Sequence, residues 1–279
     1  ADRVVLAVGH SARDVFEELL RVGAALEPKP FAMGLRIEHP QETIQRAQFG
    51  SSWEHPALPR ADYKMTYKAR DSRGVYSFCM CPGGWVVNAA SEAGGVVCNG
   101  MSDYARDSRN ANSALVVAVR PEDFGSADPL SGVEFQRVWE RAAFRTGGGD
   151  YSLPVQVLGD FVEGRRSVRL GDVEPCVRGR YRPADLSACL PAFVREGIRE
   201  ALGTFGRRIR GFDRPDAVLS GVETRTSSPV RVLRNEGLES GIAGLFPCGE
   251  GAGYAGGILS AAVDGVRAAE AVASCNRRA

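Results

Sequence analysis

The hydrophobic pattern at the start of the chain predicts a buried strand. Residues Arg3-Val-Val-Leu-Ala-Val-Gly9 form a short, β-branched apolar run, which is typical of a strand covered on both faces. Because such a strand needs neighbours on both sides, we expect further chain ahead of Ala1 in the natural protein. The alternative is a simple edge strand.

A helix follows this strand. The apolar residues after Gly9 recur at helical intervals, which predicts a helix from Ala12 to about Val22. Ser11 and Asp14 have the spacing of a capping box at the start of this helix, with aspartate in place of the usual glutamate. Residues 1–27 therefore form a first region made of one strand and one helix.

The pattern changes at Pro28-Lys-Pro30, which reads as a stiff linker. Strand-like runs then cover residues 34–38, 75–80, 85–90 and 114–119, and helical periodicity covers residues 135–142 and the stretch after Pro191. Glycine and proline separate these elements. We predict an α+β domain with an antiparallel or mixed sheet over residues 28–215.

Residues 216–279 form a third region. Short strand-like runs at 217–220, 230–232 and 244–248 lead to a glycine-rich loop, and an alanine-rich helix follows at 257–273. The apolar residues Leu259, Val263 and Val266 lie on successive turns, so we expect the small face of this helix to pack closely on a sheet. The fold class as a whole is α/β plus α+β.

Composition and charge exclude several classes of function. The 279 residues are 44% hydrophobic and 25% charged, as in a soluble globular protein, and 35 basic residues balance 34 acidic ones. This balance gives no drive toward nucleic acid or an anionic membrane, and the chain has neither a membrane span nor a signal peptide pattern. We expect a cytoplasmic protein with no nucleic-acid or membrane partner.

The cysteines and histidines indicate no metal site. Seven cysteines occur with no C-x-x-C spacing, and the chain has only three histidines, so neither a zinc site nor a disulfide framework is predicted. Cys79-Met-Cys81 is a candidate redox pair, but residues at that spacing on a strand would strain a disulfide. Buried thiols are the favoured interpretation.

The glycine-rich loop contains Gly251-Ala-Gly-Tyr-Ala-Gly256, which matches the dinucleotide fingerprint G-x-G-x-x-G. A self-contained NAD site also needs a second strand that ends in an acidic residue, about 20 residues further on. Glu270 lies at that distance but within the predicted helix, and the chain ends before another strand. An NAD-binding or methyltransferase-type Rossmann domain is therefore disfavoured.

The loop still predicts an anion site. The N-terminus of the helix that follows offers unpaired N–H groups and a partial positive charge, and the glycines allow a ligand to approach the backbone. Glu250 is placed to accept a hydrogen bond from a ligand hydroxyl. The alternative is that the glycines only allow close packing between the strand and the helix.

Several segments, in one order along the chain, carry a resemblance to a known family. They are Asp2-Arg-Val-Val-Leu-Ala-Val-Gly-His-Ser-Ala-Arg-Asp14, Tyr76-Ser-Phe-Cys-Met-Cys-Pro-Gly-Gly84, Asn99-Gly-Met-Ser102, Ala105-Arg-Asp-Ser-Arg-Asn-Ala-Asn-Ser113, Gly221-Val-Glu-Thr-Arg-Thr-Ser-Ser-Pro229 and Gly244-Leu-Phe-Pro-Cys-Gly-Glu-Gly-Ala-Gly-Tyr-Ala-Gly-Gly-Ile-Leu-Ser-Ala-Ala-Val-Asp264. Over essentially its whole length the chain resembles the C-terminal part of the uncharacterised FAD-dependent dehydrogenases.

The resemblance implies a discontinuous FAD-binding, Rossmann-like fold. Residues 1–27 would end its first segment, residues 28–215 would be an inserted substrate domain, and residues 216–279 would be the returning segment with the glycine loop and the terminal helix. The first FAD-binding segment, with its own glycine motif, is absent from this chain. We expect that segment to be a partner of this one and expect the present chain to be inactive without it.

The resemblance also implies site residues. The expected cofactor-binding residues are Gly9, His10, Ser11, Arg225, Ser228, Gly249, Glu250, Gly251, Gly253, Tyr254, Gly256, Gly257 and Ile258. The candidates for the substrate side are Lys64, Tyr67, Cys79, Met80, Cys81, Asn99, Ser102 and Arg106. No catalytic residue and no metal ligand are assigned.

Two hypotheses of function follow. The first is that the chain belongs to an FAD-dependent oxidoreductase, in which the flavin transfers hydride to or from a small-molecule substrate. The second is that it is a non-catalytic binding or interaction domain without a complete FAD site. The sequence names neither the substrate nor the electron partner.

Overall fold

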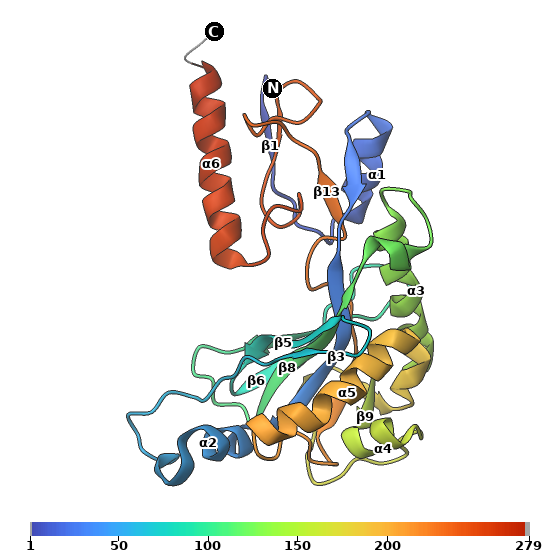
Figure 1. Ribbon diagram of the computed structural model, residues 1–279, viewed down its shortest axis with the longest axis vertical. Coiled ribbons are helices and arrows are strands. Elements are labelled where there is room, and N and C mark those ends of the chain that lie inside the picture. Colours follow the sequence, from blue (N-terminus) through green and yellow to red (C-terminus); the bar gives the residue numbers. More distant parts are fainter. Residues whose placement is uncertain (1, 277–279) are drawn as a thin grey trace. The chain divides into compact units, whose positions relative to one another are not determined.

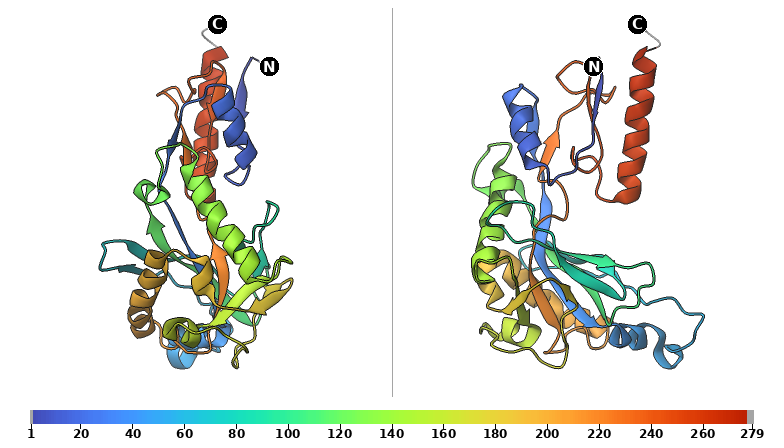
Figure 2. Two further views of the ribbon diagram at one scale, coloured as in Figure 1. Left: turned by 90° about the vertical axis from the view of Figure 1, so that its right-hand side faces the viewer. Right: turned by 180° about the vertical axis from the view of Figure 1, so that it is seen from behind.

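The computed structural model describes residues 2–276 and the side chains up to residue 274 (Figures 1 and 2). The chain divides into two compact units. The glycine-loop unit consists of the residues up to Ala32, Val119–Gln136 and the residues from Arg225 onward; the sheet unit consists of Met33–Ala118 and Arg137–Thr224. We describe each unit by itself.

The glycine-loop unit contains two small sheets, two α-helices and a 3-10 helix, together with the first residues of a helix shared with the other unit. Its elements are β1 (Val4–Leu6), α1 (Arg13–Arg21), β2 (Leu26–Pro28), the short 3-10 helix η2 (Pro121–Phe124), β13 (Val230–Val232), β14 (Leu245–Pro247) and α6 (Ile258–Asn276). Strands β1 and β14 pair in parallel, with Val4 opposite Leu245. Strands β2 and β13 pair antiparallel, with Leu26 opposite Val232.

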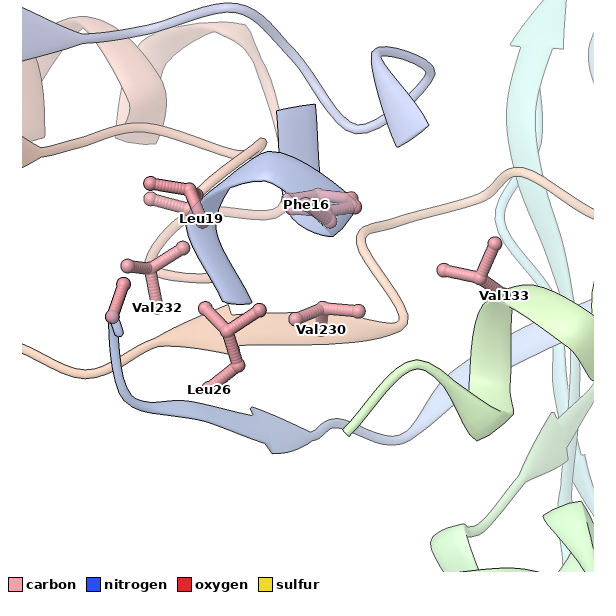
Figure 3. Packing of buried hydrophobic residues seen from close by; sticks show 8 residues of the cluster. Phe16, Leu19, Leu26, Val133, Val230 and Val232 are labelled. Atoms are coloured by element: carbon pink, nitrogen blue, oxygen red, sulfur yellow. The ribbon is translucent and has the colours of Figure 1, made fainter. Parts of the chain in front are cut away.

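The core of this unit joins segments that are far apart in the sequence (Figure 3). Phe16 and Leu19 of α1 face Leu26 of β2 and the two valines of β13, Val230 and Val232. The other members of the cluster are Ala24, Val133 and Ala252. Burying side chains of this size stabilises a fold by roughly 1.5–3 kcal/mol each. The helical spacing of Phe16 and Leu19 thus serves to fix α1 against β2 and β13.

In the first region one strand is partly exposed, and one expectation is wrong. Strand β1 is not covered on both faces within the described chain, since Val4 and Val5 are each 47% exposed. The capping box is not formed either, because α1 has Ala12 as its N-cap residue without a side-chain cap. Ser11 instead accepts a hydrogen bond from Nη1 of Arg225, at 3.1 Å.

Helix α6 is a single helix in every view (Figure 2). Fewer of its side chains are buried than we expected. Asp264 and Ala268 are buried, whereas the apolar side chains of Leu259, Val263 and Val266 are exposed. Together with Val4 and Val5 of β1, these side chains leave an uncovered apolar surface on the glycine-loop unit.

The sheet unit is built on a seven-stranded sheet with the order β11-β9-β12-β3-β8-β5-β4. These strands are β3 (Phe31–Pro40), β4 (Thr66–Lys68), β5 (Gly74–Cys81), β8 (Asn110–Val119), β9 (Leu153–Val157), β11 (Tyr181–Pro183) and β12 (Val218–Glu223). The β11–β9 pair is parallel, and the β9–β12, β12–β3, β5–β8 and β4–β5 pairs are antiparallel. The predicted mixed sheet, and with it the mixed α/β fold class, is confirmed.

A second, three-stranded sheet and several helices complete this unit. The sheet has the order β10-β6-β7, with β6 (Gly84–Asn88), β7 (Cys98–Ser102) and β10 (Val177–Arg178). The helices are α2 (Gln41–Phe49), α3 (Ser131–Thr146), α4 (Leu158–Glu163) and α5 (Ala192–Arg208), with 3-10 turns η1 (Gly50–Ser52) and η3 (Leu186–Cys189). Helix α5 lies on the large sheet at Gly197, where a Cβ would come 3.1 Å from Val117 (Figure 1).

The chain passes between the two units within β3, β8 and α3 and again after β12. The predicted boundaries at residues 27/28 and 215/216 stay a prediction; residues 119–136 also belong to the glycine-loop unit. Among the helices that the structure describes, none is long and apolar enough to cross a membrane.

Candidate functional site

The glycine loop and the loop after β1 meet at one end of a parallel strand pair. Because β1 and β14 run in the same direction, the loops that follow them leave from the same edge. Backbone contact brings them together: a Cβ on Gly251 would lie 2.6–2.8 Å from the backbone of Gly9. Ligands of parallel α/β folds bind at this carboxyl edge, so the geometry marks it as a candidate site.

An ion pair beneath the glycine loop fixes its first residue. The side chain of Asp264 in α6 accepts a hydrogen bond from Gly249 N–H at 2.7 Å and two from Arg234, at 3.0 and 2.6 Å. Arg234 also stacks 3.6 Å above the ring of Tyr254 and donates to the carbonyl of Pro247. Burial alone would raise the pKa of Asp264, but the bonds from Arg234 and Gly249 outweigh it and the pKa is lowered.

A polar cluster lies on the other side of the loop. His10 Nε2 is 3.7 Å from Glu250 Oε1, and Nδ1 of His10 is buried without a hydrogen-bond partner among the described residues. The distance is within ion-pair range. However, burial and then the charges of Arg225, Arg13 and Lys29 lower the pKa of His10 to about 4. At neutral pH the contact therefore joins a neutral imidazole to a carboxyl group.

The same cluster has an electrostatic bias toward anions. Burial raises the pKa of Glu250, against the opposing charge of Lys29. Burial also lowers the pKa of Lys29, and the neighbouring charge of Arg231 adds to this effect. Cations that depress the pKa of their neighbours create a positive potential, which an anionic ligand would relieve.

Two glycines at the end of the loop have open space. A Cβ on Gly256 would meet nothing within 4 Å, and one on Gly257 would only reach Ser260 Oγ at 4.0 Å. Helix α6 begins directly afterwards, and its first intrahelical bond runs from Ala261 N to Gly257 O. The N–H groups of the residues just before Ala261 are the ones that a helix N-terminus presents to an anion.

The sheet unit holds a separate cavity of about 910 Å³. The residues that line it include Lys64, Tyr76, Phe78, Cys79 and Met80. This volume is that of a small-molecule site. It follows the edge formed by β4 and β5, together with the segment that leads into β4.

A buried arginine supports the wall of this cavity. Nε and Nη2 of Arg36 donate to the carboxylate of Glu223 at 3.0 and 3.2 Å, and Nη1 donates to the carbonyl of Cys79 at 2.9 Å. Burial alone would lower the pKa of Arg36, but the attraction of Glu223 outweighs it and the pKa is raised. Nη2 also donates to Asn99 Oδ1 at 3.2 Å.

Comparison with known proteins identifies the family. Residues 30–226, more than half of the chain, match the family described as "FAD-dependent protein, C-terminal domain-like". The chain belongs to this family. A protein of Clostridium beijerinckii, described as "Uncharacterized protein", is 55% identical over 271 residues, which cover 96% of this chain and 51% of that relative. The chain thus spans about half the length of this relative.

Within this FAD-dependent C-terminal domain-like chain, the predicted cofactor residues fall into three groups. The first group comprises Gly9, His10, Ser11, Arg225 and Glu250, which lie at the polar cluster, and Gly256, Gly257 and Ile258, which lie at the start of α6. Those with contacts inside the unit are Gly249, Gly251, Gly253 and Tyr254. Ser228 forms the third group: it is fully buried, and its hydroxyl donates to the carbonyls of Val230 and Gly251.

The substrate-side candidates divide in a similar way. Lys64, Cys79 and Met80 line the 910 Å³ cavity, and Cys81 and Asn99 join Arg36 behind it. The structure does not bring the other three together: Tyr67 of β4 pairs with Val75 of β5, Ser102 donates to Pro82 O, and Arg106 borders a smaller cavity. The interpretation of Cys79 as a buried thiol is wrong, because its side chain is exposed; Cys81 is buried as expected.

Sequence reasoning missed three residues that organise these sites. Arg234 and Asp264 hold the glycine loop, and Arg36 holds the cavity wall. An aspartate among alanines in the predicted terminal helix was the available signal for Asp264. Arg36 stood within the predicted strand at residues 34–38, and a charged residue that such a strand buries requires a partner. In the part of the chain that the structure describes, no cluster of residues suits a metal ion.

Proposed function

We propose that this chain is part of an FAD-dependent oxidoreductase and that its glycine-loop unit holds part of the FAD. The observation that carries the proposal is the backbone contact between Gly9 and Gly251, which joins two loops at the carboxyl edge of parallel strands. The family supports FAD use by the full protein. The hydride transfer, the substrate and the electron partner belong to the proposal.

The residues at this edge fit such a cofactor. Gly256 and Gly257 leave a space next to the N-terminus of α6, where a phosphate group would accept bonds from backbone N–H groups. Nδ1 of His10 has no partner among the described residues and would donate to or accept from a ligand. The cations beside His10 would balance the charge of a pyrophosphate.

When bound, FAD would supply hydride transfer to or from a small molecule. The chain's own residues would bind and orient it. Asp264 and Arg234 would keep the loop in one conformation, and Arg225, held by Ser11, would stabilise negative charge. The 910 Å³ cavity of the sheet unit is the proposed place for the substrate.

We further propose that a separate FAD-binding segment covers the apolar surface of the glycine-loop unit. The side chains that form this surface, Val4 and Val5 of β1 and Leu259, Val263 and Val266 of α6, are all exposed. The relative from Clostridium beijerinckii is about twice as long as the matched region. A segment with a complementary apolar face would bury these side chains, at about 25 cal/mol for each Å² removed from water.

The test uses the longer natural protein and a glycine that the fold itself does not require. Gly256→Ala would place a methyl group in the space where the cofactor is proposed, while meeting no protein atom within 4 Å. Gly241→Ala is the matched control, since that position is equally open and lies in the same unit. Gly253 is unsuitable, because its Cβ would come 2.7 Å from Val230 O and disturb β13.

We expect the purified longer protein to be yellow, with about one flavin for each chain. Gly256→Ala should lower the flavin content and weaken FAD binding by about tenfold, equivalent to 1.4 kcal/mol, whereas Gly241→Ala should leave both unchanged. Absence of flavin absorbance in the longer protein would favour the non-catalytic binding domain. Equal flavin content in both variants would refute the assignment of the loop.

A further inference from the structure

The strand β5 is irregular at its two cysteines. Its pairing with β8 shifts register between Phe78 and Cys81, and Cys79 has a left-handed backbone with φ of 44°. In a regular strand, residues i and i+2 point to the same face and their thiols stay apart. In this structure the thiol of Cys81 lies close to Cys79 and donates a hydrogen bond to the backbone carbonyl of Cys79 at 3.4 Å.

The two thiols differ in access. Cys79 is exposed and lines the 910 Å³ cavity, whereas Cys81 is 7% exposed and lies behind it. An entering molecule would therefore meet the sulfur of Cys79 first. Cys81 is placed to reach that sulfur from the protein side.

Charge and hydrogen bonding favour a thiolate at the outer position. A hydrogen bond with the Cys81 side chain and the nearby charge of Arg36 lower the pKa of Cys79, and they outweigh partial burial and the charge of Glu223, which raise it. The same hydrogen bond, together with burial, raises the pKa of Cys81. The accessible sulfur is thus the nucleophile of the pair, and the inner one carries the proton.

Arg36 fixes this arrangement in place. Its side chain is fully buried, and Nη1 lies 3.7 Å from Cys81 Sγ as well as 2.9 Å from the carbonyl of Cys79. Asn112, opposite Cys81 in the register of β8, accepts from the same nitrogen. Together with Glu223 and Asn99, these contacts give the buried cation five partner residues, which hold the irregular segment in one defined conformation.

We propose that Cys79 and Cys81 form a dithiol that exchanges with small-molecule disulfides in the cavity, with Cys79 as the attacking thiol and Cys81 as the resolving thiol. The cavity is large enough for such a ligand, and its wall of Phe78, Met80 and Tyr76 offers the soft, polarisable surface that sulfur contacts well. The exchange does not require FAD, so it is independent of the function proposed above.

The chemistry balances with the disulfide as the oxidant. The Cys79 thiolate attacks one sulfur of the ligand, a new S–S bond forms, and the ligand's S–S bond breaks with release of one thiolate. Cys81 then attacks the Cys79 sulfur, and the second ligand sulfur departs with the proton that Cys81 gives up. Two electrons pass from the protein dithiol to the ligand, which leaves as one thiolate and one thiol; the thiolate takes its proton from water.

The experiment treats the chain with glutathione disulfide and follows its mass and peptide map. All proteins carry Cys275→Ser, because that position lies outside the described side chains. The variants are Cys79→Ser, Cys81→Ser and, as a control for a buried thiol, Cys98→Ser. Tryptophan fluorescence and circular dichroism confirm that each variant is folded.

The expected results differ for each protein. The parent protein should lose two hydrogens without keeping a glutathione group, and Cys81→Ser should keep one glutathione on Cys79. Cys79→Ser should not react, and Cys98→Ser should behave as the parent. Peptide mapping of the parent at short times, which needs no variant, should find any adduct on Cys79.

Either of two results would overturn the proposal. In the first, Cys81→Ser carries no glutathione on Cys79, or carries it equally on other cysteines, so Cys79 is not the attacking thiol. In the second, the parent protein retains its glutathione adduct, so Cys81 does not resolve it.

Discussion

The buried carboxyl group of Glu38 makes the stability of the sheet unit depend on pH. Glu38 lies on β3, and its Oε2 accepts bonds from Asn110 Nδ2 at 3.1 Å and from Cys176 N at 2.7 Å. Its Oε1 has no partner among the described residues. Burial outweighs these bonds and the charges of Arg109 and Arg36, and raises the pKa of Glu38 to about 7.

The size of the effect follows from this pKa. In the unfolded chain the group has its ordinary pKa of 4.5, so the native state binds more protons than the unfolded state between pH 4.5 and about 7. Stability therefore falls as the pH rises through this window. A difference of about 2.5 units at 1.36 kcal/mol each corresponds to about 3 kcal/mol.

Glu38→Gln removes this titration while keeping the shape and the acceptor. The amide oxygen would take the bonds from Asn110 and Cys176, and the amide nitrogen would stand where Oε1 has no partner. We expect the free energy of unfolding of the variant, minus that of the parent, to increase by about 3 kcal/mol between pH 4 and pH 8. If the amide also changes the free energy of unfolding by an amount that is the same at every pH, that amount does not affect the expected increase.

Urea denaturation at several pH values, monitored by tryptophan fluorescence, measures the free energy of unfolding of the variant and of the parent. Trp53, Trp85 and Trp139 all lie in the sheet unit, so the signal reports that unit. Glu42→Gln is the control, because Glu42 forms an exposed ion pair with Arg46 that contributes little. A difference that stays constant with pH, or shrinks as the pH rises, would show that Glu38 is ionised in the fold and would refute the reasoning.

Two further predictions concern the residues that hold the two sites. Arg36→Ala would leave Glu223 buried without its cation and should lower the free energy of unfolding of the sheet unit by about 3–5 kcal/mol. Urea denaturation measures this loss. A loss below about 1 kcal/mol, as expected for an exposed ion pair, would contradict the prediction. Asp264→Asn would leave Arg234 without its carboxylate and weaken the bond to Gly249 N–H. Hydrogen exchange across the glycine loop should become faster by at least about tenfold, and unchanged protection would show that this ion pair does not hold the loop.

Local patterns were sufficient to predict many of the elements. Strand-like runs located β3, β5 and β8, and helical spacing located α1, α5 and α6, because these signals depend on residues close in sequence. The glycine loop was found for the same reason. The expected coverage of β1 on both faces stays a prediction, because Val4 and Val5 are exposed in the described chain.

The supporting residues could not be predicted, because their partners are remote. Arg36 and Glu223 are 187 positions apart, and Arg234 and Asp264 are 30 apart, so only the folded chain pairs them. The exposure of Cys79 has a similar origin. It results from a register shift against β8, and the register of a strand pair depends on both strands and not on the cysteine sequence alone.

The three glycines of the fingerprint have different physical reasons to be glycine. Gly251 lies against the backbone of Gly9, and Gly253 has a left-handed φ of 87° and lies against Val230 O, so the fold itself excludes a side chain at both positions. Gly256 has neither restriction: its φ is not left-handed, and a Cβ would meet no atom within 4 Å. The close-packing alternative therefore explains the first two glycines but not the third. A ligand that approaches the backbone at the N-terminus of α6 would account for it, and this is why Gly256→Ala tests the FAD proposal more directly than a change at either of the other two.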